Sequence, residues 1–148
     1  MSEVPEGLIL PDLERKAPRP SATLTITRDG SEGVEVLLGK RSDSMPSFPG
    51  YWAFPGGGVS RIDRQASESI GISIQHCAIM REVVEELGLA PQGGRLVKVE
   101  DDFREMVAED KANWFPLALD GDIPSDSSGM RIISMRTTPP FGPTRFEN

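Results

Sequence analysis

The stretch AIMREVVEELGL, residues Ala78–Leu89, predicts a helix with one apolar face and one acidic face. At about 100° per residue, the side chains of Glu82, Glu85 and Glu86 fall within one wedge of roughly 100°. The apolar side chains point the other way, and they are Met80, Val83, Val84 and Leu87. Arg81 lies at the edge of the acidic wedge, and Gly88 is placed to end the helix in the left-handed conformation.

Three carboxylates in one small patch repel each other, which lowers stability unless a cation lies among them. All-oxygen anionic ligands suit Mg²⁺ or Mn²⁺ rather than zinc. The alternative is an acidic helix face that only meets water, and the run by itself does not decide between the two. The upstream segment FPGGG, Phe54–Gly58, favours the metal site, because a backbone without Cβ atoms can approach a metal or phosphate closely.

FPGGG followed by REVVEELG resembles the Nudix box, the signature of the Nudix hydrolase family, which is written G-x5-E-x7-R-E-U-x-E-E-x-G-U. The right half, Arg81–Leu89, matches that pattern at every defined position. With Gly57 as the opening glycine, ten extra residues lie between it and Arg81, and Asp63 stands in the slot that the family gives to glutamate. An insertion within residues 64–73 accounts for this lengthened box. Glu68 is the rival for the acidic slot.

The resemblance implies an α/β fold of the Nudix type, an α/β/α sandwich with a mixed β-sheet. It also implies a metal-dependent hydrolase that uses Mg²⁺ or Mn²⁺ and cleaves the pyrophosphate bond of a nucleoside diphosphate linked to another group. A catalytically inactive Nudix-fold module that binds nucleotides or regulates a partner is the alternative. The three helix glutamates favour the enzyme, whereas the altered left half of the box favours the inactive module.

Roles for single residues follow from the same resemblance. The metal ligands are the carbonyl of Gly57 and the carboxylates of Glu82, Glu85 and Glu86. Glu82 or Glu85 would also accept a proton from the attacking water, and Arg81 would orient the glutamates through charge-assisted hydrogen bonds. An additional base outside the box is usual in the family, and the candidates are Glu100, Asp101, Asp102, Glu105 and Glu109.

The segment Leu37–Gly57 partly resembles the signature of the coenzyme A pyrophosphatase branch, which begins L-L-x-x-R-S and ends G-x3-F-P-G-G. The matching positions are Leu37, Leu38, Arg41, Ser42 and Gly50, whereas Pro46 stands where that branch has arginine. The expected substrate is therefore coenzyme A-like or ADP-ribose-like, and Arg41 is the expected substrate-binding residue. Tyr51 and Trp52 are expected to pack against the sheet rather than to stack on a base.

The chain has 148 residues, which suits one domain. We expect an extended lead-in over residues 1–19 and a single Nudix domain over 20–148 that lacks its C-terminal elements. A net charge of −7 argues against nucleic acid or an anionic membrane as the partner. No apolar run reaches the ~20 residues of a membrane span. The predicted partner is a small nucleotide-type molecule, and a homodimer would supply an absent edge strand.

The cysteine and histidine content is low. Cys77 is the only cysteine, so no internal disulfide can form, and a reducing, cytoplasmic location is expected. Both Cys77 and His76 are expected to be structural residues on the packed side of the helix. Periodicity and turn residues predict the remaining elements, with strands over 22–28, 34–39, 95–100 and 130–136 and helices over 75–87 and 101–113.

Overall fold

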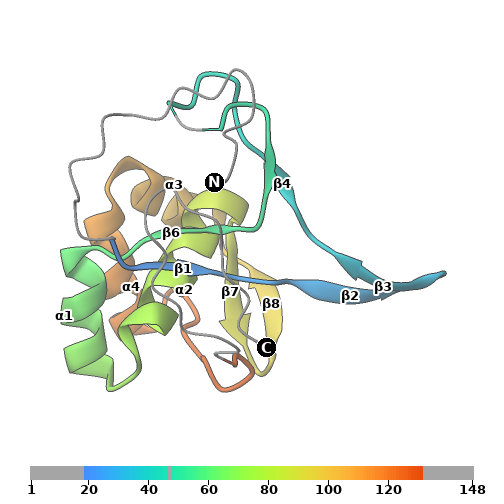
Figure 1. Cartoon of the computed structure of the whole chain (residues 1–148). Coiled ribbons are helices and arrows are strands. Elements are labelled where there is room, and N and C mark those ends of the chain that lie inside the picture. Colours follow the sequence, from blue (N-terminus) through green and yellow to red (C-terminus); the bar gives the residue numbers. More distant parts are fainter. Residues whose placement is uncertain (1–18, 47, 132–148) are drawn as a thin grey trace, which may run out of the picture. The chain divides into compact units, whose positions relative to one another are not determined.

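The computed structural model describes residues 19–46 and 48–131. The chain divides into two units, Met1–Pro20 with Ile132–Asn148, and Ser21–Arg131. The second unit holds all the helices and strands described below (Figure 1). The expected lead-in over residues 1–19 lies almost entirely outside the described residues, and so does the end of the domain that is expected to lack its C-terminal elements. Both expectations remain predictions.

The strands of this unit form four antiparallel pairs. The pairs are β1 (Ser21–Thr23) with β6 (Gly56–Gly58), β2 (Thr27–Gly30) with β3 (Gly33–Val36), β4 (Gly39–Lys40) with β5 (Trp52–Ala53), and β7 (Leu89–Gln92) with β8 (Arg95–Lys98). Figure 1 shows the β2–β3 hairpin projecting away from the helices. These two strands contact mainly each other, and all four residues of β3 are exposed.

The first predicted strand, over residues 22–28, is split between two partners. Its alternation is confirmed, since Ala22, Leu24 and Ile26 are partly buried while the intervening threonines are exposed. The chain pairs first with β6, extended by the Leu24 N–H donating to the Pro55 carbonyl, and then with β3. The second predicted strand, over 34–39, is likewise divided into β3 and β4. Periodicity predicts which side chains share a face, but it does not predict where a strand changes partner.

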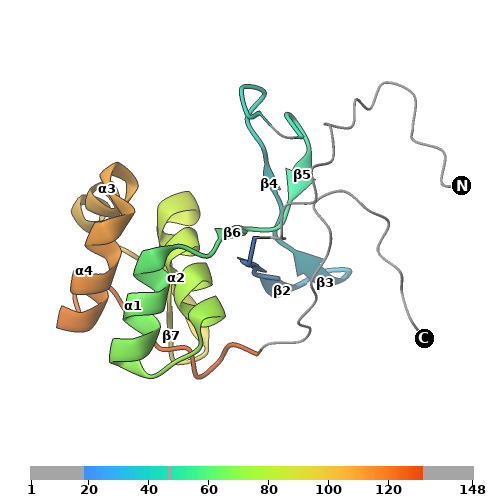
Figure 2. The ribbon, with the colours of Figure 1, turned by 60° about the vertical axis from the view of Figure 1, so that its left-hand side comes forward.

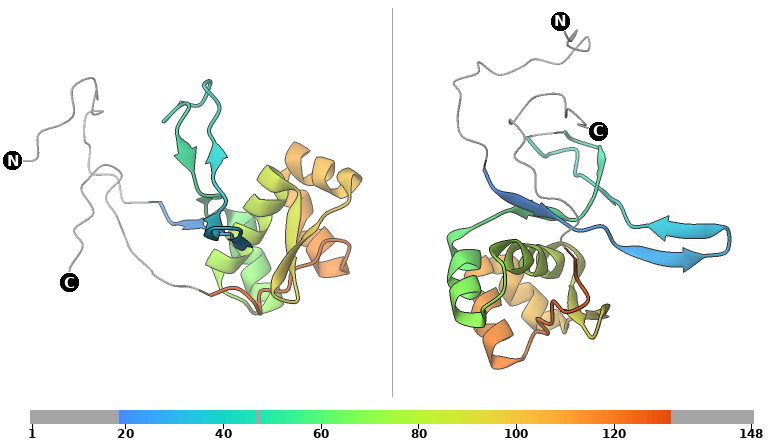
Figure 3. Two further views of the ribbon diagram at one scale, coloured as in Figure 1. Left: turned by 90° about the vertical axis from the view of Figure 1, so that its right-hand side faces the viewer. Right: turned by 60° about the horizontal axis from the view of Figure 1, so that its bottom comes forward.

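The helices gather on one side of the unit, as Figures 2 and 3 show. They are α1 (Arg61–Ile70), α2 (Ile74–Leu87), α3 (Asp101–Glu109), the 3-10 helix η1 (Lys111–Asn113) and α4 (Trp114–Asp120). The core lies between them and the β7–β8 hairpin. Its most buried large side chains are Met80, Val84, Val107, Trp114 and Ile123. No helix of the described residues is both long enough and apolar enough to cross a bilayer.

The predicted insertion, residues 64–73, forms most of α1 and the turn that follows it. Gly71 ends α1 with a φ of 79°, a left-handed conformation that glycine adopts readily. Ser73 then starts α2, because its side chain accepts a hydrogen bond from the His76 N–H at 3.2 Å. The lengthened box is therefore accommodated by an added helix, and the predicted helix over 75–87 is confirmed.

The third quarter of the chain differs from prediction in two places. The predicted helix 101–113 stops at Glu109, because the extended Asp110 caps the separate helix η1 through a hydrogen bond from the Ala112 N–H. The predicted strand 130–136 is not seen at Met130 and Arg131, which are irregular. Its remaining residues lie outside the described part of the chain.

Two of the three consecutive glycines of β6, Gly56 and Gly58, should differ in how much a change to alanine lowers stability. Gly56 has a φ of 151°, and a methyl group there would collide with the backbone of Ala22 and Thr23, whereas a methyl group on Gly58 would meet nothing within 4 Å. We expect Gly56→Ala to lower the free energy of unfolding by about 2–4 kcal/mol. Gly58→Ala should change it by less than about 0.5 kcal/mol. Urea unfolding of both variants tests this, and equal losses would contradict the assigned β1–β6 packing.

Candidate active site

Helix α2 places its carboxylates by burying the opposite face. Met80, Val83 and Val84 are each at most 1% exposed and pack in the core, so the helix cannot rotate. Glu82 and Glu85 are consequently partly buried on the other side. The left-handed Gly88, with a φ of 65°, ends the helix as its sequence predicts.

Arg81 is the centre of the site. Its side chain was expected at the edge of the acidic face, yet the residue is only 1% exposed. Its Nη1 lies 2.9 Å from Oε1 of both Glu82 and Glu85, and its Nη2 donates to the Gly58 carbonyl at 3.1 Å. Burial acts to lower the pKa of Arg81, but hydrogen bonds to Asp63 and Glu85 raise it overall. The guanidinium therefore stays charged and holds two glutamates in fixed positions.

Asp63 balances the buried charge of Arg81. It is 0% exposed, and its two oxygens accept from Nε and Nη2 of Arg81 at 2.8 and 3.0 Å. Its Oδ2 also accepts from the Ser60 N–H at 2.7 Å, so it caps the start of α1 as well. Glu68, the rival for the acidic slot, is exposed further along α1. The structure thus brings Asp63, and not Glu68, to Arg81.

The glycines of β6 lie directly against the acidic face of α2. The Gly56 N–H donates to Oε2 of Glu86 at 3.1 Å. Gly57 lies so close to Glu82 that a methyl group on it would overlap the carboxylate. A side chain at this position would displace the Glu82 carboxylate, so glycine allows the close approach of backbone and glutamate.

The carboxylates carry more negative charge than their surroundings neutralise. Burial raises the pKa of Glu82, an effect that Arg81 opposes and Glu85 increases. Burial also raises the pKa of Glu86, where the Gly56 N–H and the charge of Arg41 oppose the effect of the neighbouring glutamates. A raised pKa means that the charged form is disfavoured, so a bound cation would stabilise this group of side chains.

Comparison with known proteins identifies the family to which the chain belongs. Residues 17–131 match the family model described as NUDIX domain. The chain belongs to the NUDIX family. A search of curated proteins finds no match. Among solved structures, a NUDIX hydrolase from Alicyclobacillus acidocaldarius is 22% identical with a TM-score of 0.59.

That alignment covers 74% of this chain and 57% of the other, so the chain spans little more than half of the length of that structure. The likeness shows the fold, and the predicted α/β fold of the NUDIX type is confirmed. In the described residues the strands form separate antiparallel pairs.

The donor set of this NUDIX site suits a hard divalent cation. Among residues 19–46 and 48–131, no three His, Cys, Asp or Glu side chains are arranged to hold a metal ion as they stand. Glu82 and Glu85 each use Oε1 on Arg81, and Glu86 uses Oε2 on Gly56. The oxygens not used in these contacts and the Gly57 carbonyl offer only oxygen ligands, the kind that Mg²⁺ and Mn²⁺ prefer. The residues present therefore fit such a metal after rotation of side chains.

A groove of about 280 Å³ opens beside Glu85, between α2 and α3. It is lined by Glu85, Asp101, Arg104, Glu105 and Ala108. Of the five acids predicted as a base outside the box, only Asp101 and Glu105 line it. Asp101 also lies 3.1 Å from Nζ of Lys98, and Glu85 is paired with Arg81, so among the described residues Glu105 is the acid of this groove that forms no ion pair.

Arg104 is a site residue that the sequence did not indicate. Its side chain crosses Gly88 so closely that a Cβ there would contact its Cδ, and its Nη2 lies 3.4 Å from the Glu86 carbonyl. A cation at the C-terminal end of α2 is favourable for the helix dipole. No sequence motif marks it, because the contact depends on how α3 folds back against α2.

The other predicted residues occupy defined places. Arg41 follows β4, is partly buried, and its charge reaches Glu86. Cys77 is buried, and burial together with the charge of Asp63 raises the pKa of its thiol to about 11. His76 is partly buried, with Nδ1 3.0 Å from Oγ of Ser73, as expected for a structural residue.

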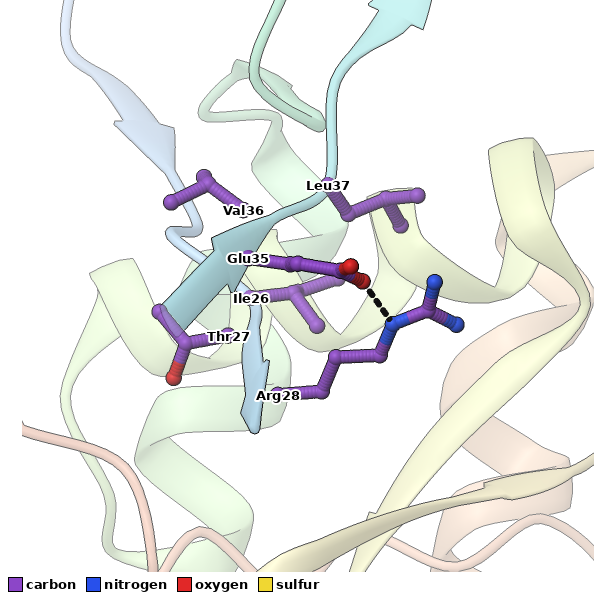
Figure 4. Close-up of a pocket in the computed structure, with 6 residues that line it drawn as sticks. All are labelled: Ile26, Thr27, Arg28, Glu35, Val36 and Leu37. Carbon is purple, nitrogen blue, oxygen red and sulfur yellow. Dashed lines mark hydrogen bonds and ion pairs between the residues drawn. The ribbon is translucent and has the colours of Figure 1, made fainter. Parts of the chain in front are cut away.

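A second groove of about 280 Å³ lies on the β2–β3 hairpin (Figure 4) and contains none of the predicted site residues. Its lining residues are Ile26, Thr27, Arg28, Glu35, Val36 and Leu37. Arg28 and Glu35 form an exposed ion pair across it, with Nε 2.6 Å from Oε2. An exposed pair of this kind contributes little to stability.

Asp63 and Glu68, the two candidates for the acidic slot, should differ in how much their substitution lowers stability. Asp63→Asn breaks the fully buried ion pair with Arg81 and places an amide group against its guanidinium, so we expect the free energy of unfolding to fall by about 3–5 kcal/mol. Glu68→Gln on the exposed face of the same helix should change it by less than about 0.5 kcal/mol. Chemical denaturation of the two variants measures both values. A loss for Glu68→Gln as large as that for Asp63→Asn would contradict the assignment.

Proposed function

We propose that this NUDIX chain is a metal-dependent hydrolase that cleaves the pyrophosphate bond of a nucleoside diphosphate linked to another group. The observation that carries the proposal is the geometry around Arg81, which holds Glu82 and Glu85 together beside the backbone of Gly57. Such a group of under-neutralised carboxylates destabilises the protein, so a bound cation accounts for it better than a merely solvated helix face does.

The residues divide the chemistry among them. Glu82, Glu85, Glu86 and the Gly57 carbonyl would hold Mg²⁺ or Mn²⁺, which when bound neutralises phosphate charge and makes water more nucleophilic. Arg81 keeps the glutamates oriented through its hydrogen bonds.

Proton transfer and phosphate binding fall to residues around this centre. Glu105 shares the groove with Glu85, and we assign to it the proton from the attacking water, with Glu82 or Glu85 as the alternative acceptor. Arg41 pairs with a substrate phosphate on the Glu86 side, because its charge already reaches that residue.

The substrate class proposed is a coenzyme A-like or ADP-ribose-like molecule. The support is the partial match of Leu37–Gly57 to the coenzyme A pyrophosphatase signature, together with the position of Arg41 near Glu86. The net acidity of the described site argues for a small anionic molecule that brings or meets a divalent cation, rather than for an anionic polymer.

The hydrolase predicts metal-dependent product release from one member of a substrate panel. Coenzyme A, ADP-ribose, NADH, diadenosine polyphosphates and nucleoside triphosphates are each incubated with Mg²⁺ and with Mn²⁺. We expect Glu85→Gln to lower kcat by about 10²-fold or more, because a metal ligand and a partner of Arg81 are altered together. Glu68→Gln, the same change on exposed α1, serves as the control and should keep full activity.

No cleavage of any member, with Mn²⁺ still bound, would replace the hydrolase by the catalytically inactive nucleotide-binding module. No cleavage and no Mn²⁺ binding would contradict both functions.

The assignment of the proton acceptor makes a separate prediction. Glu105→Gln keeps the size and hydrogen-bonding capacity of the side chain but removes the base, so kcat should fall by about 10²–10⁴-fold. Glu109→Gln, one turn further along α3 and outside the groove, should stay within a few-fold of the native rate. Steady-state kinetics on the identified substrate measures both. Equal rates for the two variants would show that the base lies elsewhere.

A further inference from the structure

Residues 39–53, which comprise β4, β5 and the loop between them, form the β4–β5 arm. Two aromatic side chains on this arm are far more exposed than expected. Tyr51 and Trp52 were expected to pack against the sheet, but they are 64% and 66% exposed. That expectation is wrong, because β4 and β5 pair only with each other and no described element covers them. Large exposed aromatic side chains next to each other mark surfaces that bind something.

The backbone places Tyr51 directly opposite Arg41. Beyond the Lys40–Trp52 pair of the ladder, the Arg41 N–H donates to the Tyr51 carbonyl at 2.8 Å. The Gly50 N–H donates to the Arg41 carbonyl at 3.2 Å, and Gly50 is left-handed with a φ of 73°. Two residues therefore oppose Arg41 in a bulge whose first residue is glycine, a device that re-aims side chains at the end of a strand pair.

Alternation along the strands then separates two faces of this arm. Lys40 and Trp52 are paired and share one face, so the next residues, Arg41 and Tyr51, share the other. Each face carries one cation and one aromatic ring. The two rings have almost the same exposure, so the faces form a matched pair.

The arm leads directly into the site, because Gly56, whose N–H donates to Oε2 of Glu86, follows Tyr51 by five residues. Of the two cations on this arm, Arg41 is partly buried, whereas Lys40 is exposed. The ring of Tyr51 is also held by Phe48, edge to face, with centroids 5.7 Å apart and planes at 72°. Tyr51 is therefore an oriented, accessible ring on the same face as a partly buried cation, a few residues before the glycines of the site.

We propose that Tyr51 and Arg41 form the nucleotide-recognition subsite, in which the Tyr51 ring stacks on the base and Arg41 pairs with the adjoining phosphate. Charge complementarity supports an anionic nucleotide as the occupant, because this arm carries Lys40 and Arg41 against the single acid Asp43, in a chain of net charge −7. Stacking on an aromatic ring is tolerant of base identity. The subsite rests on the proposed function only for the identity of the substrate, since nucleotide binding at Tyr51 can be measured without hydrolysis.

The experiment compares the binding of ADP and of inorganic pyrophosphate to the full chain by calorimetry, in the presence of Mg²⁺. ADP and pyrophosphate share the diphosphate, but only ADP has a base. Native protein should bind ADP more tightly than pyrophosphate. Tyr51→Ala should weaken ADP binding by about 5- to 150-fold and pyrophosphate binding by less than about twofold. Tyr51→Phe should retain ADP binding, and Trp52→Ala should change neither ligand.

Several results would overturn the subsite. They are no preference of native protein for ADP, an equal effect of Tyr51→Ala on both ligands, or a larger effect of Trp52→Ala. A change of oligomeric state in Tyr51→Ala with unchanged ADP binding would assign this face to protein contact instead. Failure of the proposed function gives a different result. If the native protein shows no hydrolysis but Tyr51→Ala still weakens ADP binding, the hydrolase is contradicted and the subsite is supported. Conversely, if the native protein hydrolyses its substrate but Tyr51→Ala binds ADP as tightly as the native protein does, only the subsite is contradicted.

Discussion

The buried ion pair between Arg81 and Asp63 is the interaction on which the rest of the site depends. Both side chains are essentially inaccessible to water, so neither charge is tolerable without the other. The pair joins α1 to α2, and Arg81 extends the connection to β6 through the Gly58 carbonyl. Since replacement of such pairs by apolar residues is often neutral or stabilising, its value here lies in positioning. It fixes where Glu82 and Glu85 lie relative to the glycine backbone.

This arrangement leaves the site with an excess of negative charge. Arg81 is a single cation, shared by Asp63, Glu82 and Glu85, and burial raises the pKa of Glu82 and of Glu86. The fold keeps these carboxylates together because the apolar face of α2 is packed in the core. Stability from core packing thus offsets repulsion in the site, and a divalent cation would relieve that repulsion. The same logic explains Gly57, where any side chain would displace the Glu82 carboxylate.

Local sequence signals predicted the geometry of helix α2 well. The period of 3.6 residues placed the glutamates on one face of α2, and Gly88 marked its end, because both depend only on neighbours along the helix. The choice between Asp63 and Glu68 was left open by the sequence, since it depends on how the insertion folds. An added helix places Asp63 at its capped first turn and carries Glu68 to solvent.

Features that depend on distant partners were predicted less well. The first strand changes partner near Leu24, and α3 ends where Asp110 caps another helix, neither of which leaves a periodic pattern. Tyr51 and Trp52 were expected to be covered because aromatic residues usually bury large areas. Their exposure could not be predicted, because burial requires a second surface and sequence alternation identifies only the first. Arg104 was missed for the same reason, as its contact with Gly88 joins two helices.

The most direct test of the account is the position of Mn²⁺ in crystals of the full chain, located by its anomalous scattering. The account predicts one or more peaks within ligand distance of the carboxylates of Glu82, Glu85 and Glu86, beside the Gly57 carbonyl. Arg81 should remain bonded to Asp63 in that structure, because the pair positions the ligands without taking part in binding. Mn²⁺ bound at another carboxylate cluster, or absent at saturating concentration, would contradict the account.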